Sequence, residues 1–272
     1  MSATPRVAII GPGRLGNGLA RALDGAGWSV VTLGRSVVDG WKGHLAGRDL
    51  VLLSVPDDAI AEVAVTLAAG GAVNKGHIVL HTSGARDRQA LSALDGITAG
   101  LGSFAPVQTV VDPATAAERL RGAYAVVEGD PVAVARGLEL AARLGMIGLQ
   151  LTSEAKVAYH AGAVMVANLG VALDAMAERV ASVGGVPAEA AARIYLPLWQ
   201  GMVANLAAMG AADSLTGPVR RGDVETVRRH LGVLEGEERK VYVALSREAL
   251  RIAKAAGLAK GLAAEVEKAL RE

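Results

Sequence analysis

The amino-acid sequence predicts an α/β protein in which a Rossmann-type parallel sheet is followed by an all-α C-terminal domain. Three observations lead to this prediction. The N-terminal half alternates short apolar runs with helical patterns, as in a parallel sheet whose strands are joined by helices. The first apolar run leads into a G-x-G-x-x-G turn and then a helix. Beyond residue 151 no strand pattern follows, and the chain reads as successive helices.

The composition of the chain narrows the classes of protein to which it can belong. Of its 272 residues, 51% are hydrophobic and 20% charged, so it is globular and can bury a sizeable core. Twenty-eight basic and 27 acidic residues leave a net charge of +1, which argues against a protein that follows nucleic-acid phosphates. The lack of cysteine excludes disulfides, thiolate metal sites and a cysteine nucleophile. We expect no metal site.

Two features of the sequence bear on the location of the protein in the cell. The N-terminus reaches a core strand within a few residues and lacks the tripartite order of a signal peptide. The longest apolar run, 161–173, is interrupted by Asn168 and is too short to span a bilayer. We therefore expect a soluble, cytoplasmic protein with no membrane or nucleic-acid partner.

The first strand and its turn predict a dinucleotide site. Apolar residues 7–10 run into the glycine turn, and a helix continues to about residue 26. Gly11 allows the tight turn, Gly13 lets the backbone approach a pyrophosphate, and Gly16 lets the helix pack closely on the strand. The phosphates would then lie at the positive N-terminus of the helix. The cofactor-binding residues predicted here are Gly11, Pro12, Gly13, Arg14, Leu15 and Gly16.

The second strand, 28–33, decides which nucleotide is expected. It ends in Gly34, Arg35 and Ser36, at the place where an NAD-binding protein usually carries an acidic residue. An acid would hold the ribose 2′-hydroxyl, whereas an arginine with a serine hydroxyl would hold a 2′-phosphate. We predict NADP(H) as the cofactor.

Five more strands are predicted, at 49–55, 77–81, 97–101, 124–127 and 146–151. After them, helices are separated by the glycine and proline breaks 184–187, 210, 216–218 and 257. We place the domain boundary near Leu151, which gives an NADP-binding domain of residues 1–151 and an all-helical substrate or dimerisation domain of residues 152–272.

Ligands of an open α/β sheet lie outside the carboxyl ends of its strands. Two further loops therefore become candidates for cofactor contact, one formed by Ser54, Val55 and Pro56 and the other by Thr82, Ser83 and Gly84. His81 precedes the second loop. It is either a catalytic residue or a strand-end histidine bonded to backbone.

A polar row on the helix after residue 151 supplies the other catalytic candidates, Lys156 and His160, and a candidate for substrate contact, Asn168. Lys156, His160 and Asn168 follow one another in multiples of four residues, and each step of four drifts about 40° on an α-helix. Lys156 and His160 therefore share a face, from which either could protonate a carbonyl or imine. The alternative is that Lys156 is solvated and Asn168 bridges helices.

A third cluster occupies residues 215–223. Thr216, Pro218 and Asp223 suit turn and cap positions, which alone could explain the segment. Alternatively Arg220 or Arg221 reaches an anionic substrate, with Thr216 beside it.

These motifs resemble a two-domain family that joins a Rossmann-like NADP-binding domain to a helical domain of unknown function numbered 2520. The resemblance covers almost the whole chain, and its most specific part is the Leu215–Asp223 segment. It implies an NADP-dependent oxidoreductase that is often dimeric through its helical domain. More distantly the chain is similar to pyrroline-5-carboxylate reductase, 6-phosphogluconate dehydrogenase and the 3-hydroxyacid dehydrogenases.

Two residues depart from these patterns. In 3-hydroxyacid dehydrogenases a catalytic lysine is followed four residues later by asparagine, whereas here Lys156 is followed by His160. Members of the two-domain family often carry His-Pro after the fifth strand, where this chain has Ala105. The first departure argues against a 3-hydroxyacid substrate, and the resemblance to the two-domain family names no substrate.

Two hypotheses follow from the sequence. In the first, a reductase moves hydride from NADPH to a small carbonyl or imine compound in the interdomain cleft, with His160 or Lys156 as proton donor. In the second, the protein binds NADP(H) without turnover, as a sensor or scaffold.

Overall fold

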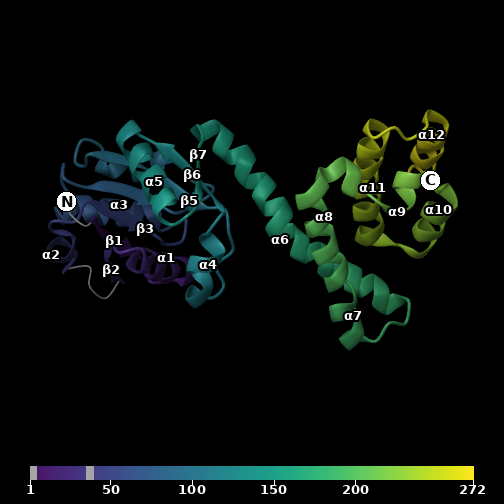
Figure 1. Cartoon of the computed structure of the whole chain (residues 1–272), viewed down its shortest axis with the longest axis horizontal. Helices are drawn as coiled ribbons and strands as arrows, with labels where there is room; N and C mark the ends of the chain where they lie inside the picture. Colours follow the sequence, from purple (N-terminus) through teal and green to yellow (C-terminus); the bar gives the residue numbers. More distant parts are fainter. Residues whose placement is uncertain (1–4, 35–39) are drawn as a thin grey trace. The chain divides into compact units, whose positions relative to one another are not determined.

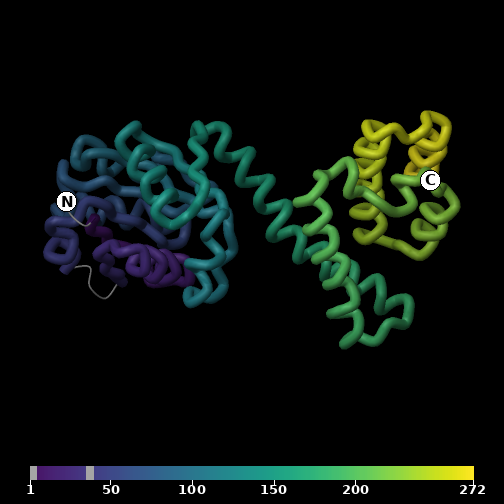
Figure 2. The backbone as a smooth tube through the Cα atoms, in the orientation of Figure 1, coloured from purple at the N-terminus to yellow at the C-terminus, as the bar shows by residue number. Residues whose placement is uncertain are grey.

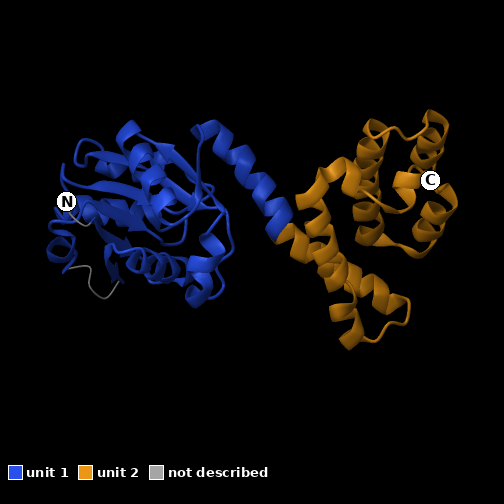
Figure 3. Cartoon of the chain, in the orientation of Figure 1, with its two compact units in different colours: residues 1–167 blue, residues 168–272 orange. Residues whose placement is uncertain are grey.

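The computed structural model describes residues 5–34 and 40–272, and it divides into two compact units, Met1–Ala167 and Asn168–Glu272 (Figure 3). The predicted 2′-phosphate site consists of Arg35 and Ser36, and both residues lie outside the described part of the chain. The domain boundary near Leu151 stays a prediction, because the compact units are divided at residue 167, inside a long helix.

Unit 1 is built on a seven-stranded sheet with the order β2-β1-β3-β4-β5-β6-β7. The strands are β1 (Arg6–Ile10), β2 (Ser29–Leu33), β3 (Leu50–Leu53), β4 (Ile78–His81), β5 (Gly100–Pro106), β6 (Tyr124–Gly129) and β7 (Ile147–Gln150). The predicted strands are confirmed as elements, and with them the Rossmann-type α/β class.

Helices cover both faces of this sheet (Figures 1 and 2). They are α1 (Arg14–Gly25), α2 (Trp41–Leu45), α3 (Ile60–Ala69), α4 (Ala116–Leu120) and α5 (Pro131–Arg143), with the 3₁₀ turns η2 (Arg88–Leu94) and η3 (Pro113–Thr115). Alternate strand residues serve the two faces: Val7 and Ile9 belong to one buried cluster, while Ala8 and Ile10 belong to the other. Strands buried on both faces explain the continuous apolar runs in the sequence.

The sheet differs from the prediction in two respects. It is parallel except between β5 and β6, which pair antiparallel. The segment between them carries η3 and α4, and α4 packs on α1, where a side chain on Gly18 would lie 2.7 Å from Cβ of Ala116. The fifth strand also begins at Gly100 rather than at residue 97, because Gly96, with φ of 72°, and the residues after it complete the turn that follows η2.

The helices after β7 are α6 (Ser153–Val183), α7 (Ala188–Ile194), α8 (Leu196–Ser214), α9 (Gly217–Arg221), α10 (Val224–Val233), α11 (Gly236–Ala255) and α12 (Lys260–Ala269). All four predicted breaks interrupt these helices. Gly210 does so inside α8, with φ of 76° and ψ of 178°, a backbone conformation that only glycine adopts readily. The core of unit 2 is formed by Val219, Val227, Leu231, Leu250, Ala263, Val266, Ala269 and Leu270.

Helix α6 is longer than the apolar run that the sequence suggested. It has 31 residues, and its length and a mean hydropathy of 1.3 in its most apolar window would by themselves suffice to cross a bilayer. Its first turns, however, place Lys156 in a polar network with β5 and the loop after β4. The N-terminal part of α6 is thus an integral part of an α/β domain.

Candidate functional site

The glycine turn after β1 has the geometry of a phosphate-binding loop. Gly11 has φ of 111°, and a side chain there would collide with the Ser54 carbonyl oxygen. A side chain on Gly16 would collide with the carbonyl oxygen of Gly11. At Gly13, by contrast, a Cβ would have no neighbour within 4 Å. Two glycines therefore permit the fold of the turn, while Gly13 leaves open space above the N-terminus of α1.

This turn lies where the strand order of the sheet reverses. The chain runs from β1 to β2 on one side and then returns to β3 on the other, so the switch point falls between β1 and β3. In register, Ile10 of β1 pairs with Leu33 of β2 and Leu53 of β3, which brings Gly11, Gly34 and Ser54 to the same edge. Ligands of doubly wound sheets bind at such a point. The geometry fits a dinucleotide.

The remaining predicted cofactor residues follow at the same carboxyl edge. Pro12, Arg14 and Pro56 are exposed, whereas Leu15, Val55 and Thr82 are half-buried. Asn17, which the sequence analysis did not single out, donates from Nδ2 to the Pro12 carbonyl over 2.7 Å and so fixes the turn. Ser83 points inward, since its Oγ accepts from the backbone N–H groups of Ala85 (3.1 Å) and Arg86 (2.9 Å).

His81 at the end of β4 is fully buried and held by backbone on both ring nitrogens. Nδ1 accepts from the Ser83 N–H at 3.2 Å, so Nε2 carries the proton that it donates to the Asp87 carbonyl at 2.9 Å. Burial, followed by the nearby Lys156 charge, lowers the pKa of His81 to about 4. This imidazole is neutral at pH 7, and it fixes the loop 82–87.

Lys156 on α6 is also fully buried. Its ammonium donates to the Arg86 carbonyl and, over 2.7 Å, to Oγ of Ser103 on β5. Burial lowers the pKa of Lys156 to about 8, although the charge of Glu128 opposes this shift. The side chain joins α6 to the sheet and to the loop after His81.

Glu128 on β6 completes this network and was missed by the sequence analysis. Its carboxylate, on a residue 4% exposed, accepts from Ser103 Oγ at 3.2 Å, Ser153 Oγ at 3.1 Å and the Arg88 N–H at 3.0 Å. A buried charge needs such partners. The signal in the sequence was an acid inside the apolar strand 124–129. We refer to Ser103, Glu128 and Lys156 as the buried triad.

His160 lies one helical turn beyond Lys156 and is only half-buried. It packs against Gly84, where an added Cβ would lie 2.5 Å from its Nδ1 and 2.9 Å from its Cε1. The structure thus brings His160, Gly84 and the loop after His81 together within unit 1. Of the three predicted catalytic residues, His160 has the greatest access to solvent.

The predicted substrate residues belong to unit 2. Asn168 is exposed on α6. Thr216 and Arg220 line one cavity of about 610 Å³, together with Arg221 and Asp213. The Arg220 guanidinium also donates to the Ala256 carbonyl over 3.3 Å, which fixes the side chain at this cavity.

The last part of the Leu215–Asp223 segment has structural roles. Gly222 ends α9 with φ of 70°, and a Cβ there would lie 2.7 Å from Cβ of Leu262. Asp223 caps α10, accepting from the Thr226 N–H at 3.1 Å and its hydroxyl at 2.8 Å. Thr216 and Arg220 are not needed for this cap.

Family models match most of the chain. The Rossmann-like domain matches residues 36–100, and the domain of unknown function DUF2520 matches residues 123–249. The fold and the glycine turn thus define a protein with a Rossmann-like domain. DUF2520 follows the Rossmann-like domain along this chain, and the resemblance predicted from the sequence is confirmed.

Solved structures share the fold over nearly the whole chain. The protein TM1727 from Thermotoga maritima is 23% identical with a TM-score of 0.73, covering 92% of this chain and 98% of that one. A putative NADP oxidoreductase, BF3122 from Bacteroides fragilis, is 21% identical with a TM-score of 0.68, covering 90% and 98%. A reductive aminase from Aspergillus terreus in complex with NADPH is 16% identical with a TM-score of 0.57, covering 99% and 93%. No curated protein sequence matches significantly.

Proposed function

We propose that the protein is an NADP(H)-dependent oxidoreductase that reduces a small carbonyl or imine compound. The observation that carries this proposal is the glycine turn at the switch point, where Gly13 leaves space for a pyrophosphate at the N-terminus of α1. The NADP oxidoreductase and reductive aminase whose folds are similar to this chain support the same class.

NADPH would be held by the residues predicted from the sequence. The glycine turn contacts the pyrophosphate, Arg35 and Ser36 contact the 2′-phosphate, and the loops at 54–56 and 82–84 line the path toward the nicotinamide. When bound, the cofactor supplies a hydride. The protein must then supply a proton to the oxygen or nitrogen of the reduced bond.

His160 is the proton donor in this proposal. It is half-buried beside Gly84, at the loop that follows β4. Lys156 and His81 are positioning residues, because both are fully buried and hold the loop 82–87 through the Arg86 and Asp87 carbonyls. Thr216 and Arg220 bind the substrate, with the guanidinium facing a carboxylate or another anionic group, and Asn168 hydrogen-bonds to it.

We further propose that the protein is a cytoplasmic homodimer. Unit 2 exposes large apolar side chains on α6 and α8, among them Val171 (71% exposed), Leu198 (67%) and Val203 (59%). Exposed apolar patches of this kind mark interaction surfaces in soluble proteins. A second copy that covers them would also explain the apolar character of α6. Light scattering tests this: a monomeric mass at micromolar concentration would refute it.

The reaction is tested by turnover of ketones and cyclic imines with 4-deuterated NADPH. We expect deuterium in the product of the wild-type enzyme and a loss of kcat of about 100-fold or more in His160→Ala, the usual contribution of a general acid. His44→Ala, which removes an exposed histidine from α2, is the matched control. Full activity of His160→Ala would refute its role. NADPH binding without turnover of any compound would favour the sensor or scaffold instead.

A further inference from the structure

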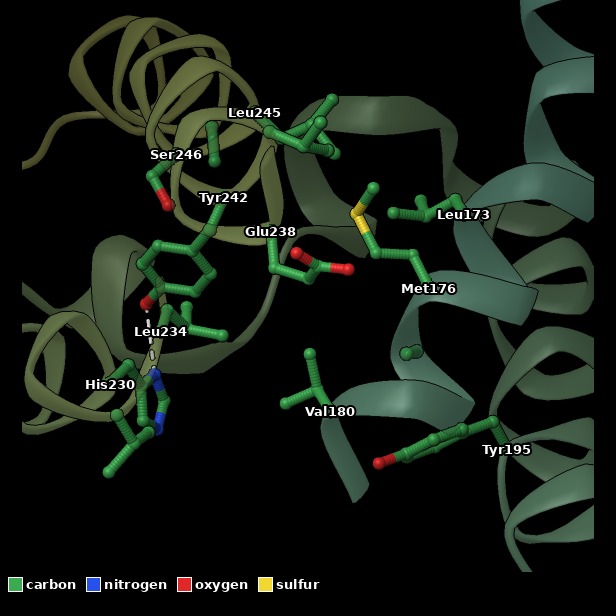
Figure 4. A pocket seen from close by; sticks show the side chains of 14 residues that line it. Leu173, Met176, Val180, Tyr195, His230, Leu234, Glu238, Tyr242, Leu245 and Ser246 are labelled. Carbon is green, nitrogen blue, oxygen red and sulfur yellow. Dashed lines mark hydrogen bonds between the residues drawn. The ribbon is translucent and has the colours of Figure 1, made fainter. Parts of the chain in front are cut away.

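The helical unit contains a cavity that the proposed reaction does not use. It has a volume of about 500 Å³ and lies between the second half of α6, α10 and α11 (Figure 4). Its volume falls within the range of small-molecule sites, which is about 300–1,000 Å³. All its lining residues belong to unit 2, and none of them is among the residues assigned above to cofactor, proton transfer or substrate.

Most of the cavity wall is apolar. Leu173, Met176 and Val180 line it from α6, and Leu245 lines it from α11 on the opposite side (Figure 4). Aliphatic side chains facing one another across such a space favour a ligand with an apolar body, because burial of that body removes apolar surface from water.

A few polar groups converge on the same cavity. His230 and Tyr242 form a pair, with 2.9 Å between Nδ1 and the hydroxyl oxygen and an edge-on ring arrangement at 5.7 Å. Burial raises the pKa of Tyr242, so its hydroxyl is protonated at neutral pH. The hydrogen bond between the two side chains runs in either direction according to the His230 tautomer, and in both cases the hydroxyl oxygen keeps a lone pair for a ligand. The half-buried ring of Tyr242, which lines the cavity, also offers a π-face to a cation.

Glu238 gives the cavity its charge. No lysine or arginine lies among the lining residues, and the Glu238 carboxylate points into the space between Tyr242 and Met176 (Figure 4). Its Oε1 accepts from Nε (3.3 Å) and Nη2 (3.1 Å) of Arg179, whose side chain is 59% exposed, so this surface ion pair is weak. Its Oε2 accepts no hydrogen bond from another of the described residues and can accept one from a ligand. Hydrogen bonds from its own backbone N–H and from Arg179 lower the pKa of Glu238, so the group is ionised at neutral pH.

We propose that this cavity binds a small hydrophobic amine, whose ammonium group contacts Glu238 and the ring and hydroxyl of Tyr242, and whose aromatic or alicyclic body lies among the aliphatic side chains. A neutral or anionic molecule of the same shape would lack the charge-assisted hydrogen bond. The proposal is independent of the reaction assigned to the protein, since it requires neither the cofactor nor His160.

Isothermal titration of 2-phenylethylamine into the full-length protein, without cofactor, tests this site. We expect saturable binding, and binding at least about tenfold weaker for 2-phenylethanol and 3-phenylpropanoate, since a charge-assisted hydrogen bond is lost. Glu238→Gln should weaken amine binding by about the same factor. Glu237→Gln is the matched control, because Glu237 is the neighbouring residue, is 73% exposed and does not line the cavity.

A second variant keeps the test decisive if Glu238→Gln is unstable. Ala177→Phe adds a ring to the cavity wall and should abolish amine binding while leaving NADPH binding unchanged. Equal binding of the alcohol and the amine, or unchanged binding in Glu238→Gln or Ala177→Phe, would overturn the proposal. The proposal would also be overturned if the wild type is a dimer that binds no amine and Ala177→Phe dissociates this dimer. A second copy of the chain would then occupy the cavity.

Discussion

The buried Lys156 should give the protein a stability that rises with alkaline pH. Burial lowers the pKa of this lysine from 10.5 to about 8 in the folded chain. Between these pH values the unfolded chain binds more protons than the folded one, so the free energy of unfolding increases as pH rises. Below pH 8 Lys156 is protonated in both the folded and the unfolded chain, so burial of its charge lowers the free energy of unfolding by the full amount.

The size of this effect follows from the shift. A difference of about 2.5 pKa units corresponds to about 3 kcal/mol, at 1.36 kcal/mol per unit. The free energy of unfolding of the wild type, minus that of Lys156→Met, should therefore rise by about 3 kcal/mol between pH 7.5 and 10.5.

Urea unfolding followed by tryptophan fluorescence measures this difference. Trp199 lies in unit 2, so a Trp199→Phe background leaves only Trp28 and Trp41, which are both buried in unit 1. Lys42→Met removes an exposed lysine from α2 and corrects for the general effect of alkaline pH. A constant or falling difference between wild type and Lys156→Met would refute the reasoning about the buried triad.

Two further predictions concern the proposed reaction. Gly84→Ala places a Cβ 2.5 Å from the His160 ring and should lower kcat by about tenfold or more, as expected when a general acid is displaced. Gly43→Ala is the control, because a Cβ on Gly43 has no neighbour within 4 Å. Equal kcat for the two variants would contradict the role of His160. Arg35→Ala should cost about 1.5–3 kcal/mol of NADPH binding, or about tenfold or more, and leave NADH binding unchanged. Titration of both cofactors measures this preference, and equal wild-type affinity for NADPH and NADH would contradict the 2′-phosphate assignment.

The sheet could be predicted from the sequence because its strands are buried on both faces. Continuous apolar runs such as 50–53 and 78–81 record this burial directly. The antiparallel pairing of β5 with β6 could not be predicted, since a strand buried on both faces has the same apolar pattern in either direction. The direction depends instead on where η3 and α4 pack, which is a tertiary property.

In the candidate site, too, the part that is local in sequence could be predicted and the part that depends on tertiary packing could not. The glycine turn is local in sequence, and each of its glycines has a steric reason that a short motif records. The buried triad combines residues 103, 128 and 156 from two strands and a helix, so no spacing reveals it. Only the acid at 128 within an apolar strand signalled a buried network, because a charge at such a position needs partners.

The most direct test of the central claim is NADPH titration of wild type and Gly13→Val. Gly13 has φ of −74° and ψ of −175°, which any residue adopts, and its side-chain position is open, so the variant should fold normally. Gly25→Val, at the other end of α1 and equally open, is the matched control. We predict that Gly13→Val weakens NADPH binding by about tenfold or more, since the pyrophosphate contacts are charge-assisted hydrogen bonds. Equal NADPH affinity of wild type, Gly13→Val and Gly25→Val would contradict the dinucleotide site.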